Sequence, residues 1–96
     1  MKTSFVYFLT NKSRTTLYIG VTNDLHRRIQ EHISGLGSKF TSKYNCHDLI
    51  YFEKFNDINL AIEREKQLKK WNRNKKEKLI DTINPGEYFF DVPAKA

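Results

Sequence analysis

The stretch FVYFLTNKSRTTLYIGV, residues 5–21, decides the fold of this chain. Two runs rich in β-branched and aromatic residues, 5–9 and 15–21, flank a short polar segment with turn composition. Side chains alternate between the two faces of a strand, and an antiparallel hairpin brings Tyr7 of the first run close to Tyr18 of the second. The sequence therefore predicts a hairpin that gathers two phenol groups in one place.

A helix is expected directly after this hairpin, because Thr22 or Asn23 can accept hydrogen bonds from its first turn as an N-cap. Leu25, Ile29 and Ile33 recur at four-residue spacing, which predicts an apolar stripe that packs on the sheet. The hairpin and this helix together form the first half of the expected core.

Arg28 and His32 form a parallel stripe on the same helix, one residue away from the apolar stripe. This position puts a guanidinium and an imidazole at the edge of the core, where they line a cleft. A solvated arginine and a histidine that packs at a helix end are the plainer alternatives. Beside two tyrosines, the pair is a candidate for binding one phosphate group.

The remaining chain predicts a third strand and two further helices. Residues 38–47 have the composition of a polar loop, residues 49–55 that of a strand, and residues 58–71 that of a helix, with a short last helix ending near residue 83. The expected apolar contacts of these helices come from Ala61, Leu68, Trp71, Leu79, Ile80 and Ile83. The order strand, strand, helix, strand, helix, helix predicts an α+β domain with a small, three-stranded, mainly antiparallel sheet flanked by helices.

The length of 96 residues predicts one domain over residues 1–96, with its core at about 5–83 and a C-terminal tail at 84–96. No apolar run approaches the roughly 20 residues of a membrane helix, and the start has no signal-peptide pattern, so a cytoplasmic location is expected. Cys46 is the only cysteine, which excludes an internal disulfide and any cysteine-rich zinc site.

The positive charge is concentrated in one segment. The chain has 17 Lys and Arg against 11 Asp and Glu, a net charge of +6, which favours phosphate-bearing partners. Residues 66–78 hold seven basic side chains and one acidic side chain, so the net charge of this segment equals the net charge of the whole chain. A solvated face is the usual meaning of such a run, but the near absence of acids favours sequence-independent binding to a nucleic-acid backbone. The candidate contacts are Lys66, Lys69, Lys70, Arg73, Lys75 and Lys76.

Glu65 is expected on the inner side of the helix at 58–71. A carboxylate in that position is unfavourable unless a cation pairs with it. Arg64, a neighbouring lysine or a metal ion can supply the opposite charge, and a structural salt bridge is the plain alternative to metal binding.

The motif residues, taken together, resemble those of a known family. They are Val6-Tyr7, the run from Tyr18 to Leu25, Arg27-Arg28, His32, Ala61, Arg64-Glu65 and Leu68-Lys69. With them the chain resembles a GIY-YIG nuclease domain, in particular the small stand-alone members related to the N-terminal nuclease domain of the bacterial excinuclease C subunit. Phe5 replaces the glycine of the first triad, whereas the triad at Tyr18 is intact.

The resemblance implies a divalent-metal-dependent endonuclease that hydrolyses DNA phosphodiester bonds, with structure-specific cleavage in repair or recombination as its setting. It implies that Glu65 binds one Mg²⁺ or Mn²⁺ ion, that Arg28 clamps the phosphate and that His32 orients a group or shuttles a proton. One tyrosine takes a proton from the attacking water. Tyr18 is favoured as this base and Tyr7 as the positioning group, with exchanged or shared roles as the alternative.

Two other functions remain open from the sequence. The first is a non-catalytic nucleic-acid-binding module on the same fold, and the second is an adaptor domain in which the tyrosines are only core residues.

Arg27 is expected to make a surface contact with DNA. A homodimer with one active site per chain would cut both strands, whereas a monomer would nick one.

Overall fold

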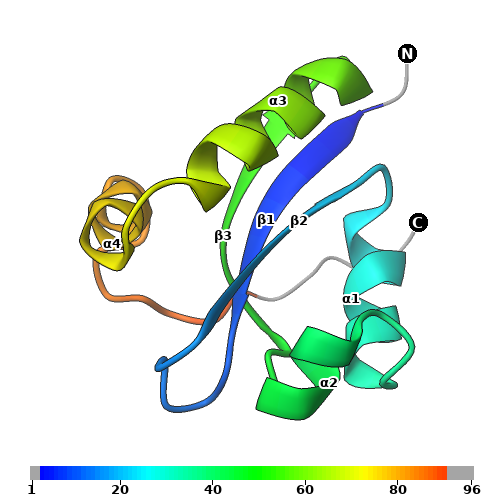
Figure 1. Ribbon diagram of the computed structural model, residues 1–96, viewed down its shortest axis with the longest axis vertical. Coiled ribbons are helices and arrows are strands. Elements are labelled where there is room, and N and C mark those ends of the chain that lie inside the picture. Colours follow the sequence, from blue (N-terminus) through cyan, green and yellow to red (C-terminus); the bar gives the residue numbers. More distant parts are fainter. Residues whose placement is uncertain (1–2, 91–96) are drawn as a thin grey trace.

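The structure is a computed structural model that describes residues 3–90 (Figure 1). Three strands form one antiparallel sheet in the order β2-β1-β3, with β1 at Ser4–Thr10, β2 at Leu17–Thr22 and β3 at Asp48–Phe55. The helices are α1 (Leu25–Ile33), α2 (Lys39–Tyr44), α3 (Ile58–Lys69) and α4 (Arg73–Asp81). The predicted α+β fold with a three-stranded antiparallel sheet is confirmed.

The hairpin of β1 and β2 sets the positions of the two tyrosines. Tyr7 lies directly opposite Gly20, and Leu9 lies opposite Tyr18. Tyr7 and Tyr18 are therefore diagonal neighbours on one face of the sheet, and their ring centroids are 6.3 Å apart. Because β2 is an edge strand, Tyr18 lies at the border of the sheet.

The sheet separates two apolar layers. One face carries Val6, Phe8 and Ile19, which pack with Leu68 of α3 and Ile80 of α4. The opposite face packs against α1, with these buried residues in its cluster: Tyr7, Leu9, Leu25, Ile29, Cys46 and Leu49. Figure 1 shows α3 and α4 separated from α1 and α2 by the strands. The alternation predicted for β1 is confirmed, and Tyr7 belongs to the layer that includes α1.

A bulge in β3 adjusts the third strand to this two-sided core. The pairing shifts between Phe8, opposite Tyr51, and Leu9, opposite Leu49, so Ile50 is the extra residue. Ile50 and Tyr51 consequently both join the layer under α3, while Leu49 faces α1.

The predicted polar loop at residues 38–47 is wrong, because α2 forms there. The Ser38 side chain caps this helix by accepting a hydrogen bond from the Thr41 backbone N–H at 3.1 Å. Asn45 ends the helix in the left-handed conformation, with φ of 55°. Thr41 and Cys46 are fully buried, so this segment covers part of the core.

Three details of the predicted helices are also corrected. Asp24, rather than Thr22 or Asn23, is the N-cap of α1, and its carboxylate accepts a hydrogen bond from the Arg27 backbone N–H at 3.0 Å. The third helix ends at Lys69 instead of residue 71. Its successor α4 ends at Asp81, which leaves Ile83 57% exposed rather than packed.

The apolar stripe of α1 also differs from the expectation at its last position. Leu25, Ile29 and His32 are buried, whereas Ile33 is 49% exposed. With 3.6 residues per turn, the buried face passes through positions 25, 29 and 32 in this nine-residue helix. His32 therefore takes the core position that the sequence pattern assigned to isoleucine.

The chain after α4 folds back on the sheet, with Phe89 and Phe90 packed against its two apolar layers and Tyr88 73% exposed. The buried Asn84 side-chain amide donates to the carbonyl oxygens of Ile50 and Tyr88, both at 2.9 Å. Phe90 donates its backbone N–H to the Leu49 carbonyl oxygen at 2.7 Å. The rest of the predicted tail, residues 91–96, lies outside the described residues. In residues 3–90, no helix is both long enough and apolar enough to cross a membrane.

Candidate active site

A hydrogen bond between Tyr7 and His32 forms the buried centre of the site. The Tyr7 hydroxyl oxygen lies 2.9 Å from His32 Nε2, and both residues are 0% exposed. Burial, the largest effect, raises the pKa of the Tyr7 phenol above its ordinary value of 10. In the free protein Tyr7 is consequently a neutral phenol.

Thr41 determines which nitrogen of His32 carries the proton. Thr41 Oγ1 lies 2.8 Å from His32 Nδ1, and its hydroxyl donates to the Ser38 carbonyl oxygen at 3.2 Å. Because the Thr41 hydroxyl gives its one proton to the Ser38 carbonyl oxygen, it accepts from His32 Nδ1–H. His32 Nε2 then accepts from the Tyr7 hydroxyl. The fold therefore presents a neutral imidazole with its acceptor nitrogen aimed at a phenol.

Two glycines make room for these rings. A Cβ atom on Gly20 would lie 2.4 Å from the Tyr7 hydroxyl oxygen, and one on Gly37 would lie 2.2 Å from His32 Nδ1. Any side chain at either position would collide with the ring. Gly20 thus leaves room for the Tyr7 phenol to lie against β2.

Tyr18 is the more accessible tyrosine. Its ring lies 5.2 Å from the His32 ring and 6.0 Å from that of Phe40, measured between centroids. Tyr18 is partly exposed, and it lines a surface depression at the outer edge of β2. Tyr18 can thus contact both His32 and a molecule in solution.

Arg28 is held at the edge of the same cluster. Its guanidinium donates to Glu31 Oε1 at 3.0 Å and to the Gly37 carbonyl oxygen at 3.1 Å. The hydrogen bond to Glu31 is the largest cause that raises the pKa of Arg28, and the Tyr7 phenol also interacts with this guanidinium. Arg28 is therefore a fixed positive charge beside the phenol.

Glu65 approaches from the other side of the sheet, on α3. Its carboxylate oxygen lies 3.5 Å from Lys69 Nζ, and its side chain is 20% exposed. The charge of Glu65 acts on Tyr7, raising the pKa of that phenol, and Lys69 lines the same depression as Tyr18. The ion pair with Lys69 thus connects Glu65 to the depression that Tyr18 lines at the edge of β2.

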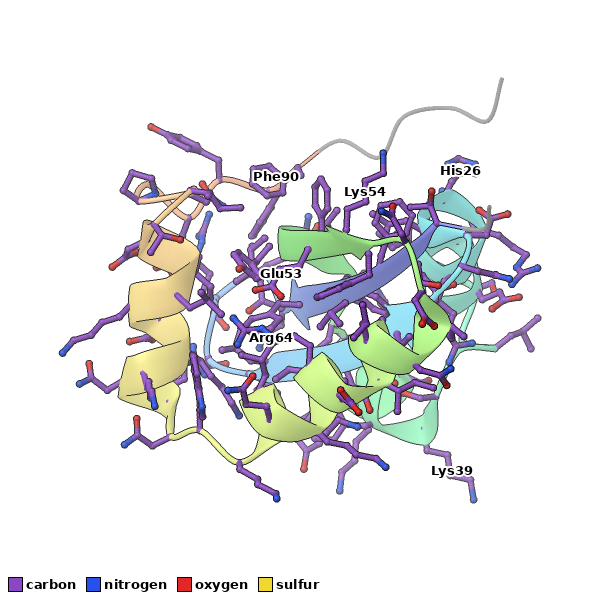
Figure 2. The ribbon with its side chains drawn as sticks, turned by 90° about the horizontal axis from the view of Figure 1, so that it is seen from above. His26, Lys39, Glu53, Lys54, Arg64 and Phe90 are labelled. Atoms are coloured by element: carbon purple, nitrogen blue, oxygen red, sulfur yellow. The ribbon has the colours of Figure 1, made fainter. Side chains whose placement is uncertain are left out.

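A neighbouring lysine, rather than Arg64, pairs with Glu65. Arg64 instead forms two hydrogen bonds with Glu53, from Nε at 2.8 Å and from Nη2 at 3.0 Å. Figure 2 shows Glu53 and Arg64 close together between the sheet and α3. Tyr51 also donates to Glu53, so this cluster connects β3 to α3 and helps to fix the helix that carries Glu65.

The donor set is compatible with one hard divalent cation. Among residues 3–90, no three His, Cys, Asp or Glu side chains are grouped closely enough to enclose a metal ion. Mg²⁺ commonly binds through one or two carboxylates, and retains several waters and substrate phosphate oxygens as its other ligands. Glu65 alone fits that mode, whereas it does not fit a closed site of four protein ligands.

Some of the basic residues predicted to bind DNA extend into solvent, and others make contacts within the protein. Lys66 and Lys70 are exposed, and Lys75 lies over the Trp71 ring, 4.2 Å from its centroid. Arg73 is 40% exposed and makes structural contacts, because its guanidinium donates to the carbonyl oxygens of Arg14 and Thr15 at 2.6 and 3.1 Å. These bonds connect the start of α4 to the turn between β1 and β2.

The remaining predicted contacts are Lys69, Lys76 and Arg27. Lys69 and Lys76 line the depression beside Tyr18. Arg27 is an exposed residue of α1, and its Nε lies 3.7 Å from Glu31 Oε2. Two lysines thus lie beside Tyr18, and Arg27 belongs to α1, the helix that carries Arg28 and His32.

Sequence reasoning missed Glu31 and Thr41 as parts of this site. Glu31 follows Arg28 by three residues and Arg27 by four, the spacing at which helical side chains meet, so its pairing had a local signal. Thr41 had only a weak signal, the cap pattern from Ser38 to Thr41, and its contact with His32 depends on how α2 packs.

The pKa of His32 leads to a stability prediction. Burial, followed by the charge of Arg28, lowers the pKa of His32 from 6.5 to about 4. Between these values the unfolded chain binds a proton that the folded chain does not, so unfolding free energy falls as the pH decreases from 6.5 to 4. The expected loss from this group is on the order of 3 kcal/mol.

Urea unfolding of wild type and His32→Gln at several pH values measures this effect. The variant is expected to have a lower stability at pH 7 and a shallower decline toward pH 4, because the other titrating groups are common to both proteins. Parallel declines in the two proteins would contradict the prediction.

Comparison with known proteins defines the class of this chain. Residues 3–78 match the family model described as the GIY-YIG catalytic domain. The chain belongs to the GIY-YIG family, a family of nuclease domains.

Within that family the chain is similar to UPF0213 proteins. It is 40% identical over 79 residues to UPF0213 protein CPE1444 of Clostridium perfringens, a match that covers 82% of this chain and 84% of the relative. UPF0213 protein YazA of Bacillus subtilis is 37% identical over 82 residues, with 84% and 83% covered. The solution structure of UPF0213 protein BH0048 from Bacillus halodurans is 34% identical, has a TM-score of 0.57, and matches 88% of this chain and 90% of its own.

Proposed function

We propose that this protein is a divalent-metal-dependent endonuclease that hydrolyses DNA phosphodiester bonds. The proposal rests mainly on one observation, the Tyr7–His32 hydrogen bond with Tyr18 and Arg28 around it. This cluster combines a phenol with solvent access, a neutral imidazole and a fixed guanidinium. Hydrolysis of a phosphodiester needs a positioned water, a proton acceptor and positive charge at the phosphoryl oxygens.

Arg28 is proposed to bind the scissile phosphate. Its side chain is 28% exposed, and Glu31 and the Gly37 carbonyl hold the guanidinium from behind. A guanidinium fixed in this way can donate two parallel hydrogen bonds to phosphate oxygens, and it stabilises the charge that develops on them.

Tyr18 is proposed to contact the attacking water and, after giving its own hydroxyl proton to solvent, to accept a proton from that water as a phenolate, because it is the phenol that solvent reaches. Tyr7 is proposed to position the site. Its hydrogen bond orients His32, whose ring packs against Tyr18 at 5.2 Å. His32 remains neutral near pH 7, and its Nε2 is the hydrogen-bond partner of the Tyr7 hydroxyl.

Glu65 is proposed to hold one Mg²⁺ or Mn²⁺ ion. Such an ion would supply Lewis-acid stabilisation of phosphate charge. Lys69 neutralises Glu65 in the free protein and would have to release the carboxylate for the ion to bind. Glu65 is the residue of this chain through which metal dependence would arise.

The proposed partner is DNA, bound through phosphate contacts by basic residues beside Tyr18 and on α1. Such binding is expected to weaken steeply as salt is raised. Structure-specific cleavage in repair or recombination in the cytoplasm, and a homodimer that cuts both strands, extend the same proposal.

The Glu65–Lys69 pair favours one second candidate, a nucleic-acid-binding module without catalysis. An ion pair that persists would leave Glu65 as a structural residue of α3. The catalytic proposal and this alternative make opposite predictions about nicking.

Nicking of supercoiled plasmid DNA tests the proposal. Wild type is expected to convert the plasmid to open circles with Mg²⁺ or Mn²⁺ but not with EDTA. Arg28→Ala is expected to be slower by about 100-fold or more, since it removes a charge aimed at the transition state.

Arg27→Ala is the matched control, because it removes the same charge from the adjacent, exposed position on α1. It is expected to lose far less activity than Arg28→Ala. Equal nicking by wild type and Arg28→Ala would indicate a contaminating nuclease. DNA binding without cleavage of supercoiled, single-stranded or branched DNA under every metal condition would favour the non-catalytic module.

A further inference from the structure

The depression at the outer edge of β2 combines apolar walls with two lysines. It has a volume of about 270 Å³ and is lined by Leu17, Tyr18, Ile19, Phe40, Lys69 and Lys76. This volume is below the roughly 300–1,000 Å³ of sites for drug-sized molecules, and it suits a group as small as one nucleobase. Its chemistry, aromatic surface with adjacent ammonium groups, matches a nucleotide better than an apolar ligand.

Aromatic rings continue from this depression along α2. Phe40 and Tyr44 are each 41% exposed, and their ring centroids are 4.7 Å apart. The Phe40 ring also lies 6.0 Å from the Tyr18 ring, with 31° between their planes. An exposed row of rings of this kind offers faces on which bases can stack.

Positive charge accompanies the rings. Lys43 lies over Tyr44, with Nζ 5.3 Å from the ring centroid. Burial, followed by the charge of Arg73, lowers the pKa of Lys76, so an anion beside Lys76 would relieve an unfavourable environment. Aromatic rings with interspersed lysines are the usual composition of surfaces that bind single-stranded nucleic acid.

The depression is also adjacent to the proposed scissile phosphate. Tyr18 belongs to both places, and Lys69 connects the depression to Glu65 through their ion pair. A nucleotide bound here would directly neighbour the phosphate held by Arg28. In a duplex each base is stacked on both faces and paired at its edge, so only an unpaired nucleotide can place its face on Phe40.

We propose that the Phe40 depression binds one unpaired nucleotide next to the scissile phosphate, so that the preferred substrate is single-stranded or has an unpaired segment at the cleavage site. The base stacks on Phe40, and Lys69 and Lys76 contact the flanking phosphates. This inference extends the proposed function, because it assigns a substrate class to the same site.

Equilibrium binding without divalent ions tests the inference separately from catalysis. Fluorescence anisotropy in EDTA would compare a 12-nucleotide single strand with its 12-base-pair duplex, for wild type and two variants. Phe40→Leu is expected to weaken binding of the single strand by about 5- to 150-fold, the range for loss of one stacked base, with less than a twofold change for the duplex. Phe52→Leu is the matched control, because Phe52 is 37% exposed but lies on β3, away from β2.

Lys76→Gln is the second variant, with Lys78→Gln on the same helix as its control for charge. Lys76→Gln is expected to weaken single-strand binding several-fold more than Lys78→Gln. Circular dichroism verifies that each variant is folded, and the two pairs provide independent tests of the depression.

Three outcomes would decide the matter. The inference would be overturned if Phe40→Leu bound the single strand as tightly as wild type does. It would also be overturned if this variant lost the same affinity for the single strand and for the duplex. If Phe40→Leu loses affinity for the single strand only, and wild type cleaves no substrate, the nucleotide-binding depression is supported and the proposed nuclease activity is not. Nicking of duplex plasmid that Phe40→Leu leaves unchanged, together with unchanged binding, would support the nuclease and overturn the unpaired-nucleotide site.

Discussion

Glu65→Gln is expected to slow DNA cleavage by at least about 1,000-fold, because it removes the one carboxylate proposed to hold the metal ion. Glutamine keeps the size of the side chain and removes its negative charge. The appropriate measurement is the single-turnover cleavage rate at saturating Mg²⁺, so that a change in DNA affinity does not enter. In the same variant, protection of the protein from thermal unfolding by Mn²⁺ should disappear.

Stability and DNA binding separate this effect from damage to the fold. The Glu65–Lys69 pair is partly exposed and spans one helical turn, so its loss is expected to change the free energy of unfolding by only about 0.5 kcal/mol. DNA affinity in EDTA is expected to stay equal or increase, because the protein becomes more positive. Glu63→Gln is the matched control, with the same charge change at an exposed position of α3. A Glu65→Gln enzyme that retains more than a tenth of wild-type activity would exclude a required metal ligand at this position.

Local sequence pattern was sufficient for the framework of the fold. The alternation in residues 5–9 predicted which side chains of β1 face each layer, and the tyrosine-bearing hairpin formed as expected. The error at Ile33 has a simple geometric origin. Four-residue spacing drifts away from the 3.6-residue period of a helix, so over two turns the buried position moves from 33 to 32.

The segment that forms α2 illustrates a different limit. Six polar and aromatic residues have too little apolar periodicity to predict a helix. Tertiary packing supplies what the local pattern lacks, since Thr41 is buried against His32 and Gly37 comes close to the same ring. The role of α2 in holding His32 therefore follows from its tertiary contacts and could not be predicted from its own sequence.

The candidate site was predicted in part for the same reason. The types and spacing of Tyr7, Tyr18, Arg28 and His32 placed them near one another, because hairpin register and helix periodicity are local properties. Partners fixed by packing between elements were beyond such reasoning. Glu65 was expected to need a cation, yet only the structure distinguished Lys69 from Arg64, which pairs with Glu53 on β3.

The two tyrosines should respond differently to replacement by phenylalanine. Tyr18→Phe is expected to lower the single-turnover rate by about 100- to 10,000-fold, the range for loss of a general base, with little change in stability. Tyr18 is partly exposed, so removal of its hydroxyl leaves water to solvate the surroundings.

Tyr7→Phe is expected to act on the fold as well as on the rate. It removes a buried hydroxyl and leaves His32 Nε2 without its partner, which should cost about 1–3 kcal/mol of unfolding free energy. An unpaired Nε2 is also easier to protonate, so the acid-induced loss of stability should begin at a higher pH than in wild type. Urea unfolding and single-turnover cleavage, both measured from pH 5 to pH 9, provide the comparison.

The comparison of these variants decides which phenol is the base. A larger rate loss in Tyr18→Phe, together with a larger stability loss in Tyr7→Phe, is the expected pattern. The opposite pattern in the rates, with Tyr18→Phe within tenfold of wild type, would assign the base to Tyr7 and make His32 Nε2 the acceptor of its proton. In that case substrate binding would have to open the Tyr7–His32 pair to water, because Tyr7 is fully buried in the free protein.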